Sequence, residues 1–175
     1  AIKQIQALDL PVRFGGEIAN STDEANGFDF DYLTAKEQRR MDRFILFAIA
    51  AADEAIKQAG LTESPEIKNN AGTIIASGIG GLHVMSEAAV ATHQSPPAKI
   101  TPFTVPGFLA NLAAGQVSMR HGLKGPIGCP VTACAASAQA IGDAARIIRA
   151  GEASVMVAGG AEACVTRLGI GGFTA

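Results

Sequence analysis

Residues 130–142 read Pro-Val-Thr-Ala-Cys-Ala-Ala-Ser-Ala-Gln-Ala-Ile-Gly. This pattern predicts the end of a buried strand, a tight corner that carries Cys134, and the first turns of a buried helix. Val131 and Thr132 are residue types that favour strands. Alanine occupies four of the six positions after Cys134 and favours a helix. Because no charge follows until Asp143, we expect this helix to pack inside the protein, with backbones in close approach.

The position of Cys134 at the start of a helix gives its thiol a possible chemical role. Thiolate is the nucleophilic form of cysteine. The unpaired N–H groups and partial positive charge at a helix start favour a thiolate and bind a developing oxyanion. Such a cysteine suits acyl transfer. Cysteine is also among the most buried residue types and often serves as a small hydrophobe, so position alone leaves both interpretations open.

Composition and charge exclude several classes of protein. The chain has 175 residues, of which 48% are hydrophobic and 17% charged, enough for one domain with a sizeable core. A formal net charge of −2 gives no overall field for nucleic acid or a membrane surface. The longest apolar run, residues 44–52, has nine residues, far short of the ~20 that span a bilayer. Lys3, Asp9 and Pro11 interrupt any N-terminal apolar region, so no secretory signal is predicted.

The cysteines and glycines predict neither a metal nor a cofactor. Three cysteines, at positions 129, 134 and 164, are an odd number and do not indicate a disulfide framework. A reducing, cytoplasmic compartment fits them better. Their spacing matches no common zinc pattern. A Gly-x-Gly pair ends at Gly80, but His83 stands where a dinucleotide-binding motif has its third glycine.

Helical and strand patterns alternate along the chain. One helix is expected to open at Thr34 and a second helical segment to run from Asp42 to a stop at Gly60, with further helices at 82–93, 106–122 and after Cys134. The expected strands lie at 73–76, 127–133 and 153–158. Thr34-Ala35-Lys36-Glu37 has the form of a capping box that opens the first helix. The alternation indicates a parallel or mixed sheet with helices on its faces. Residues 169–175 are glycine-rich and predict a loop.

Six separated segments of the sequence, taken together and in order, form a pattern that is specific enough to compare with known families. They are Lys-Glu-Gln-Arg-Arg-Met-Asp (36–42), Ser-Gly-Ile-Gly-Gly-Leu (77–82), Ile-Thr-Pro-Phe with Val-Pro (100–106), Thr-Ala-Cys-Ala-Ala-Ser (132–137), Ala-Ile-Gly (140–142) and Val-Ala-Gly-Gly-Ala-Glu (157–162). In content and order these segments resemble the β-ketoacyl-[acyl-carrier-protein] synthases of fatty acid synthesis, above all the bacterial elongating type II enzymes. The resemblance covers nearly the whole chain.

The resemblance implies a thiolase-like α/β fold. That fold has a mixed, mainly parallel sheet with helices on both faces and a buried helix behind the catalytic cysteine. Residues 1–175 would form an N-terminal β-ketoacyl synthase domain, half of a duplicated core and incomplete at both ends. The family's first strand would precede Ala1, and a second half with two catalytic histidines would follow Ala175. Because His83, His93 and His121 match no catalytic position of the family, residues 1–175 alone are expected not to catalyse condensation.

The implied reaction is a decarboxylating Claisen condensation. An acyl group moves from the thiol of an acyl carrier protein to Cys134, malonyl carrier protein then loses carbon dioxide, and its carbanion attacks the thioester. The backbone N–H of Cys134 would supply half of the oxyanion hole.

The family's acyl pocket maps onto Ile79, Thr104, Val105, Ala133, Gly169 and Phe173. Ile79 matches the gating residue at the depth of that pocket. Thr104 and Val105 would come from the partner subunit of a homodimer, with Thr104 in place of a bulky aromatic residue.

Four basic residues match the family's docking surface for its acidic carrier protein. Lys36, Arg39 and Arg40 recur at helical spacing, and Lys99 would lie nearby. Without the resemblance, an ordinary solvated helix face explains the same spacing.

Two other interpretations compete with the elongating synthase. One is another thiolase-fold acyltransferase, such as a polyketide ketosynthase or a biosynthetic thiolase. Thiolases use coenzyme A substrates, so a requirement for a carrier protein separates these enzymes. The other is a non-enzymatic partner subunit, like the chain-length factors that pair with ketosynthases. Those subunits typically lack the nucleophile, and Cys134 argues against this interpretation.

Overall fold

The computed structural model describes residues 10–12, 15–21, 27–61, 64–94 and 100–175. The chain divides into two compact units. The α/β unit consists of Arg43–Gly80 and Leu109–Glu162, and the helical unit consists of Ala1–Asp42, Gly81–Phe108 and Ala163–Ala175.

The α/β unit is built on a three-stranded parallel sheet. The central strand, β1 (Ala71–Ala76), lies between β2 (Ile127–Gly128) and β3 (Val155–Gly160). Thr73 lies opposite Ile127 on one side and Val157 on the other. All six residues of β1 are buried, as expected for a central strand covered on both faces.

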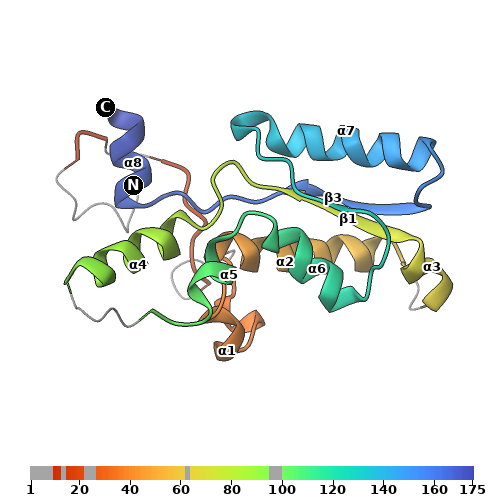
Figure 1. The fold of residues 1–175 in the computed structure, drawn as a ribbon, viewed down its shortest axis with the longest axis horizontal. Helices are drawn as coiled ribbons and strands as arrows, with labels where there is room; N and C mark the ends of the chain where they lie inside the picture. Colours follow the sequence, from red (N-terminus) through yellow and green to blue (C-terminus); the bar gives the residue numbers. More distant parts are fainter. Residues whose placement is uncertain (1–9, 13–14, 22–26, 62–63, 95–99) are drawn as a thin grey trace. The chain divides into compact units, whose positions relative to one another are not determined.

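Helices cover both faces of this sheet, as the sequence predicts (Figure 1). Helix α7 (Ala136–Arg149) packs on one face, against β1 and β3. Helices α2 (Arg43–Gln58) and α6 (Leu112–His121) lie on the other face, and the short helix α3 (Pro65–Asn69) leads into β1. The α7 side of the core is made of small residues, since Ala136, Ala140 and Ala144 pack against Ile74 and Ala76. Backbones therefore approach closely there.

Two expectations for the stretch around Cys134 are wrong in detail. The predicted buried helix is buried only along its alanine stripe, because α7 packs on the sheet with one face. Ile141 and Ile148 on this helix are 57% and 43% exposed. The predicted strand over 127–133 is limited to β2, which ends before Cys129-Pro130. Proline has no N–H to donate to the ladder, so the pairing stops at this point.

The single helix predicted over 106–122 is in fact two, α5 (Thr104–Phe108) and α6. At the end of α5, the carbonyl of Gly107 accepts from the N–H of Asp42, and that of Phe108 accepts from the N–H of Gly81. These carbonyls bond to other segments of the helical unit instead of continuing the helix.

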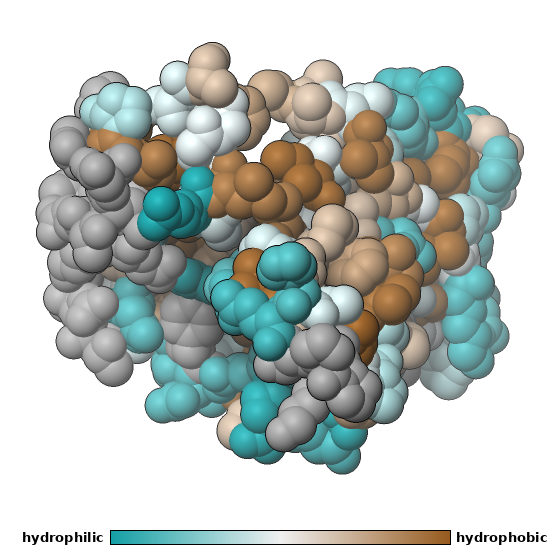
Figure 2. Space-filling view, turned by 60° about the vertical axis from the view of Figure 1, so that its left-hand side comes forward, coloured by the Kyte–Doolittle hydropathy of each residue, from teal (hydrophilic) through white to brown (hydrophobic). Residues whose placement is uncertain are grey.

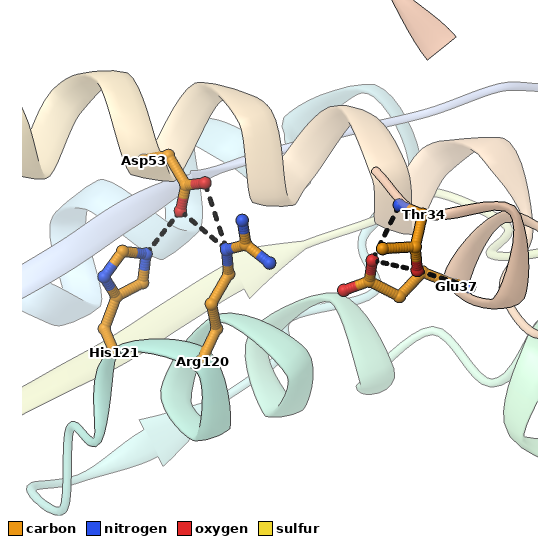
Figure 3. A network of polar contacts seen from close by, with 5 residues as sticks. All are labelled: Thr34, Glu37, Asp53, Arg120 and His121. Atoms are coloured by element: carbon orange, nitrogen blue, oxygen red, sulfur yellow. Dashed lines mark hydrogen bonds and ion pairs between the residues drawn. The ribbon is translucent and has the colours of Figure 1, made fainter. Parts of the chain in front are cut away.

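In its described residues, the helical unit has the elements η1 (Phe30–Tyr32), α1 (Ala35–Gln38), α4 (Leu82–Gln94), α5 and α8 (Arg167–Thr174). The predicted capping box is present, since Thr34 and Glu37 exchange hydrogen bonds at the start of α1 (Figure 3). The glycine-rich loop predicted at 169–175 is instead part of α8. The hydroxyl of Thr166 accepts from the N–H of Gly169 and caps that helix.

Large hydrophobic side chains reach the surface in several places (Figure 2). Those of the α/β unit include Met119, Ile127 and Val131, each more than half exposed. Within the described ranges no helix combines the length and the apolar character that crossing a membrane requires.

Candidate active site

Cys134 lies at a tight corner before α7. It is the middle residue of a short 3-10 turn, η2 (Ala133–Ala135), and its side chain is exposed. Ala133 has a φ of 49°, in the left-handed region that non-glycine residues rarely adopt, at a cost of about 1–3 kcal/mol. The turn is closed by the N–H of Ala135, which donates to the carbonyl of Thr132 at 3.1 Å. The corner therefore presents the thiol outward from a strained backbone.

The loop after β1 lies beside this corner. A Cβ placed on Gly78 would be 3.5 Å from the Cα of Ala133 and 2.9 Å from a carboxylate oxygen of Glu162. A Cβ on Gly160, at the end of β3, would collide with the hydroxyl of Ser137. The ends of β1 and β3 thus meet the start of α7 at glycine positions, because no side chain fits between them.

Glu162 binds this loop through its carboxylate. One oxygen accepts from the N–H groups of Gly78 at 2.8 Å and Ile79 at 2.9 Å. The hydroxyl of Ser77, which is buried, lies 3.4 Å from both carboxylate oxygens and accepts from the N–H of Gly80 at 3.0 Å. No role for Glu162 itself was predicted from the sequence. Its place two residues after a strand that ends in Gly-Gly, within the segment Val-Ala-Gly-Gly-Ala-Glu (157–162), was the available signal.

The other two cysteines have different surroundings. Cys129 is partly buried, and burial raises the pKa of its thiol, against a smaller lowering by a backbone hydrogen bond from Ser77. Cys164 is also partly buried, and its carbonyl accepts from the N–H of Thr166 at 2.8 Å. None of the three cysteines, all of which the structure describes, forms a disulfide, and Cys134 is the exposed one.

A second polar cluster joins α2 to α6 (Figure 3). The carboxylate of Asp53 accepts from Nε of Arg120 at 3.0 Å and lies 2.5 Å from Nε2 of His121. His121, the last residue of α6, is thus bonded to α2. In the part of the chain that the structure describes, no three His, Cys, Asp or Glu side chains lie close enough together to hold a metal ion.

Comparison with known proteins gives the family of this chain. Residues 2–175 match the family described as "Beta-ketoacyl synthase, N-terminal domain". The chain belongs to the β-ketoacyl synthase family. Family membership confirms the resemblance drawn from the six sequence segments.

Curated relatives carry the name 3-oxoacyl-[acyl-carrier-protein] synthase 2. One from Rhizobium meliloti is 44% identical over 99% of this chain, and one from Synechocystis sp. is 40% identical over 98% of it. The chain spans 42% and 40% of the lengths of these two relatives.

Solved structures confirm the thiolase-like ketosynthase fold. A type II polyketide ketosynthase, solved in complex with its acyl carrier protein, superposes with a TM-score of 0.77 at 26% identity, over 82% of this chain and 42% of its own. A β-ketoacyl synthase from Burkholderia phymatum superposes with a TM-score of 0.65 at 26% identity, over 76% of this chain and 33% of its own.

The six predicted acyl-pocket residues of this β-ketoacyl synthase chain fall in both units. Ile79 and Ala133 belong to the α/β unit, and Ile79 is 42% exposed on the loop that Glu162 binds. The other four belong to the helical unit: Thr104 and Val105 on α5, and Gly169 and Phe173 on α8. A Cβ on Gly169 would collide with the carbonyl of Cys164, whereas Phe173 is 82% exposed.

A cavity of about 610 Å³ lies within the helical unit, between α4 and α8. Its lining includes His83 and Val90 of α4 and Leu168 and Gly171 of α8. None of the six predicted pocket residues lines it.

Three of the four predicted docking residues lie in the part of the chain that the structure describes. Lys36 and Arg39 are exposed on and directly after α1. The guanidinium of Arg40 is half-buried and stacks over the ring of Phe103 at 4.0 Å, an attraction between a cation and an aromatic face. Lys99 lies outside the described residues.

Proposed function

We propose that this protein is a 3-oxoacyl-[acyl-carrier-protein] synthase of fatty acid elongation in which Cys134 carries the acyl group. The observation behind this proposal is the exposed thiol on a strained corner at the start of α7. The printed names of the relatives supply the substrate class. No other thiol of this chain has a comparable position, since Cys129 and Cys164 are both partly buried.

In the first half-reaction, the thiolate of Cys134 attacks the thioester carbonyl of an acyl carrier protein. A C–S bond forms, the carbonyl electrons move to oxygen, and the resulting oxyanion is received by backbone N–H groups that include that of Cys134. When the oxyanion collapses, the bond to the carrier sulfur breaks and the carrier thiol leaves with a proton. The acyl group then remains on Cys134 as a thioester.

In the second half-reaction, malonyl carrier protein loses carbon dioxide, and the electron pair of the broken C–C bond becomes a carbanion. The carbanion attacks the acyl carbonyl on Cys134, a new C–C bond forms, and the Cys134 sulfur leaves. The product is a 3-oxoacyl carrier protein, longer than the acyl group by two carbons. A reducing compartment, the cytoplasm, would keep the thiol of Cys134 available between cycles.

The partner we infer is an acidic acyl carrier protein that docks on Lys36, Arg39, Arg40 and Lys99. Two described side chains in this set, Lys36 and Arg39, are exposed. A complex of a ketosynthase with its acyl carrier protein is among the similar structures. Reversal of both charges in Arg39→Glu/Arg40→Glu should weaken carrier binding by about tenfold at low salt and less at high salt, where such steering is screened. Unchanged carrier affinity would indicate an ordinary solvated helix face.

We also propose a homodimer in which Thr104 and Val105 complete the acyl pocket of the partner subunit. Val105 is 53% exposed on α5, and Thr104 is partly exposed. Sedimentation of the full-length protein tests the assembly, and a monomeric, fully active enzyme would contradict it.

The experiment that tests the function is a condensation assay of the full-length protein. Acyl and malonyl carrier proteins are supplied, or the same groups on coenzyme A, and the 3-oxoacyl product is measured by mass spectrometry. We expect turnover with the carrier proteins. Turnover with coenzyme A thioesters alone would favour a thiolase instead.

A polyketide ketosynthase is the second candidate, favoured by the structural similarity to a ketosynthase bound to a hexaketide. Repeated condensation without reduction between steps, which gives a chain of several keto groups, would identify that activity. A single condensation per acyl group favours fatty acid elongation.

A further inference from the structure

The loop formed by Ser77–Gly80 follows the last residue of β1. Its N–H groups can no longer join the sheet ladder, so they bond to other acceptors. Side chains supply those acceptors. Glu162 accepts from Gly78 at 2.8 Å and Ile79 at 2.9 Å, and Ser77 accepts from Gly80 at 3.0 Å.

The two bonds to Glu162 converge on one carboxylate oxygen. Hydrogen bonds to an ionised carboxylate are about twice as strong as those between neutral groups. Glu162 follows β3 by two residues, while the loop follows β1. The carboxylate therefore ties together the ends of two neighbouring parallel strands.

This loop touches the corner that carries Cys134. The Cα position of Gly78 faces Ala133, to which a Cβ would come within 3.5 Å. Gly78 of this loop thus neighbours both the carboxylate of Glu162 and the residue before Cys134. Ile79, the next residue, holds its side chain 42% exposed. A shift of this loop would move Ile79 relative to Cys134.

We propose that Glu162 is a positioning residue that fixes Ile79 beside the Cys134 corner and thereby sets the acyl-chain selectivity of the site. The selectivity rests on the proposed function, whereas the tie between Glu162 and the loop rests on geometry alone. The carboxylate does not need to touch the substrate, since it acts through the two N–H groups of the loop.

The test uses the full-length protein with Glu162→Ala and Glu162→Gln. The glutamine variant keeps an acceptor oxygen but loses the charge. Glu152→Ala is the matched control, because Glu152 is an exposed glutamate near the other end of β3. Two quantities are measured: the deuterium exchange rates of the Gly78 and Ile79 amides, and the ratio of Cys134 acylation rates for a long-chain and a short-chain acyl carrier protein.

Glu162→Ala should speed exchange of both amides by about tenfold or more and change the acylation ratio by about tenfold. Glu162→Gln should give smaller changes of the same sign, about threefold. Glu152→Ala should leave both quantities unchanged. A variant that fails to fold would lose protection along all of β1, and the glutamine variant then decides the question.

Unchanged exchange at Gly78 and Ile79 in Glu162→Gln and Glu162→Ala overturns the inference. Faster exchange with an unchanged acylation ratio overturns the selectivity role. A wild-type protein that is not acylated at Cys134 contradicts the proposed function and the selectivity role together, and the exchange rates then still show whether Glu162 holds the loop.

Discussion

The α/β unit holds two polar arrangements that differ in their construction. Asp53, Arg120 and His121 bond side chain to side chain and join two helices on one face of the sheet. At the strand ends, Glu162 bonds instead to backbone N–H groups, next to glycines and a strained alanine before Cys134.

The first arrangement has more titratable groups, and the second has the features that acyl transfer needs. A histidine beside an aspartate is familiar from catalytic sites, but here the pair is occupied in packing α6 against α2. The corner of Cys134 offers an exposed thiol and backbone N–H groups at the start of a helix. We therefore expect the proposed chemistry at the available nucleophile, Cys134, rather than where most charges lie together.

The largest effect is expected at the nucleophile. Cys134→Ala should reduce condensation by on the order of a thousandfold or more, because the proposed function places the acyl thioester on Cys134. Product formation from acyl and malonyl carrier proteins measures this loss. Cys129→Ser is the control and should keep most of the activity. If Cys134→Ala keeps its activity, the Cys134 corner has no more claim to the chemistry than the cluster of Asp53, Arg120 and His121.

A smaller effect is expected beside the nucleophile, at Ile79. Ile79→Phe should lower acylation by long chains by about tenfold relative to short ones, since each methylene excluded from an apolar pocket forfeits about 0.8 kcal/mol. Competition between two acyl carrier proteins of different chain length gives the ratio. Equal losses for both substrates would indicate a folding defect and no role in selectivity.

The pH dependence of alkylation separates Cys134 from Cys129. Burial raises the pKa of Cys129, so its thiol stays protonated to higher pH. The alkylation rate of Cys129 should therefore increase only at a pH above the range in which an ordinary cysteine ionises. Desolvation of the thiolate also makes folding less favourable as pH rises through that range. Iodoacetamide labelling followed by peptide mass spectrometry should therefore find Cys134 labelled first at neutral pH. Faster labelling of Cys129 at neutral pH would contradict this order.

The smallest effect on chemistry is expected from the helix-joining cluster. Asp53→Ala should lower the free energy of unfolding by about 1–2 kcal/mol, because Arg120 and His121 lose a partly buried partner. Urea unfolding measures this change, with Glu54→Ala as the control, since Glu54 is exposed on the same helix and bonds to Gln58. The rate of Cys134 acylation should not change. A large fall in that rate in folded Asp53→Ala would give the cluster a chemical role.

Local signals in the sequence predicted most elements of the fold. The capping box at Thr34 and the apolar run of β1 depend on neighbouring residues, and both are observed. The end of β2 and the break between α5 and α6 were missed, because they depend on which distant N–H and C=O groups are satisfied. The contribution of Glu162 was missed for the same reason, since Gly78 and Ile79 are far from it in sequence.

The candidate site was only partly predictable. Cys134 and its corner follow from a short motif, whereas the positive φ of Ala133 has no signal in an alanine. The acyl pocket was assigned by resemblance, and its six residues fall in both units.

The most direct measurement locates the acyl group itself. Full-length protein is mixed with an acyl carrier protein, digested, and each cysteine-containing peptide is weighed by mass spectrometry. We predict the added acyl mass on the peptide that contains Cys134 and on no other. An acyl group on Cys129 or Cys164, with Cys134 unmodified, would contradict the central claim.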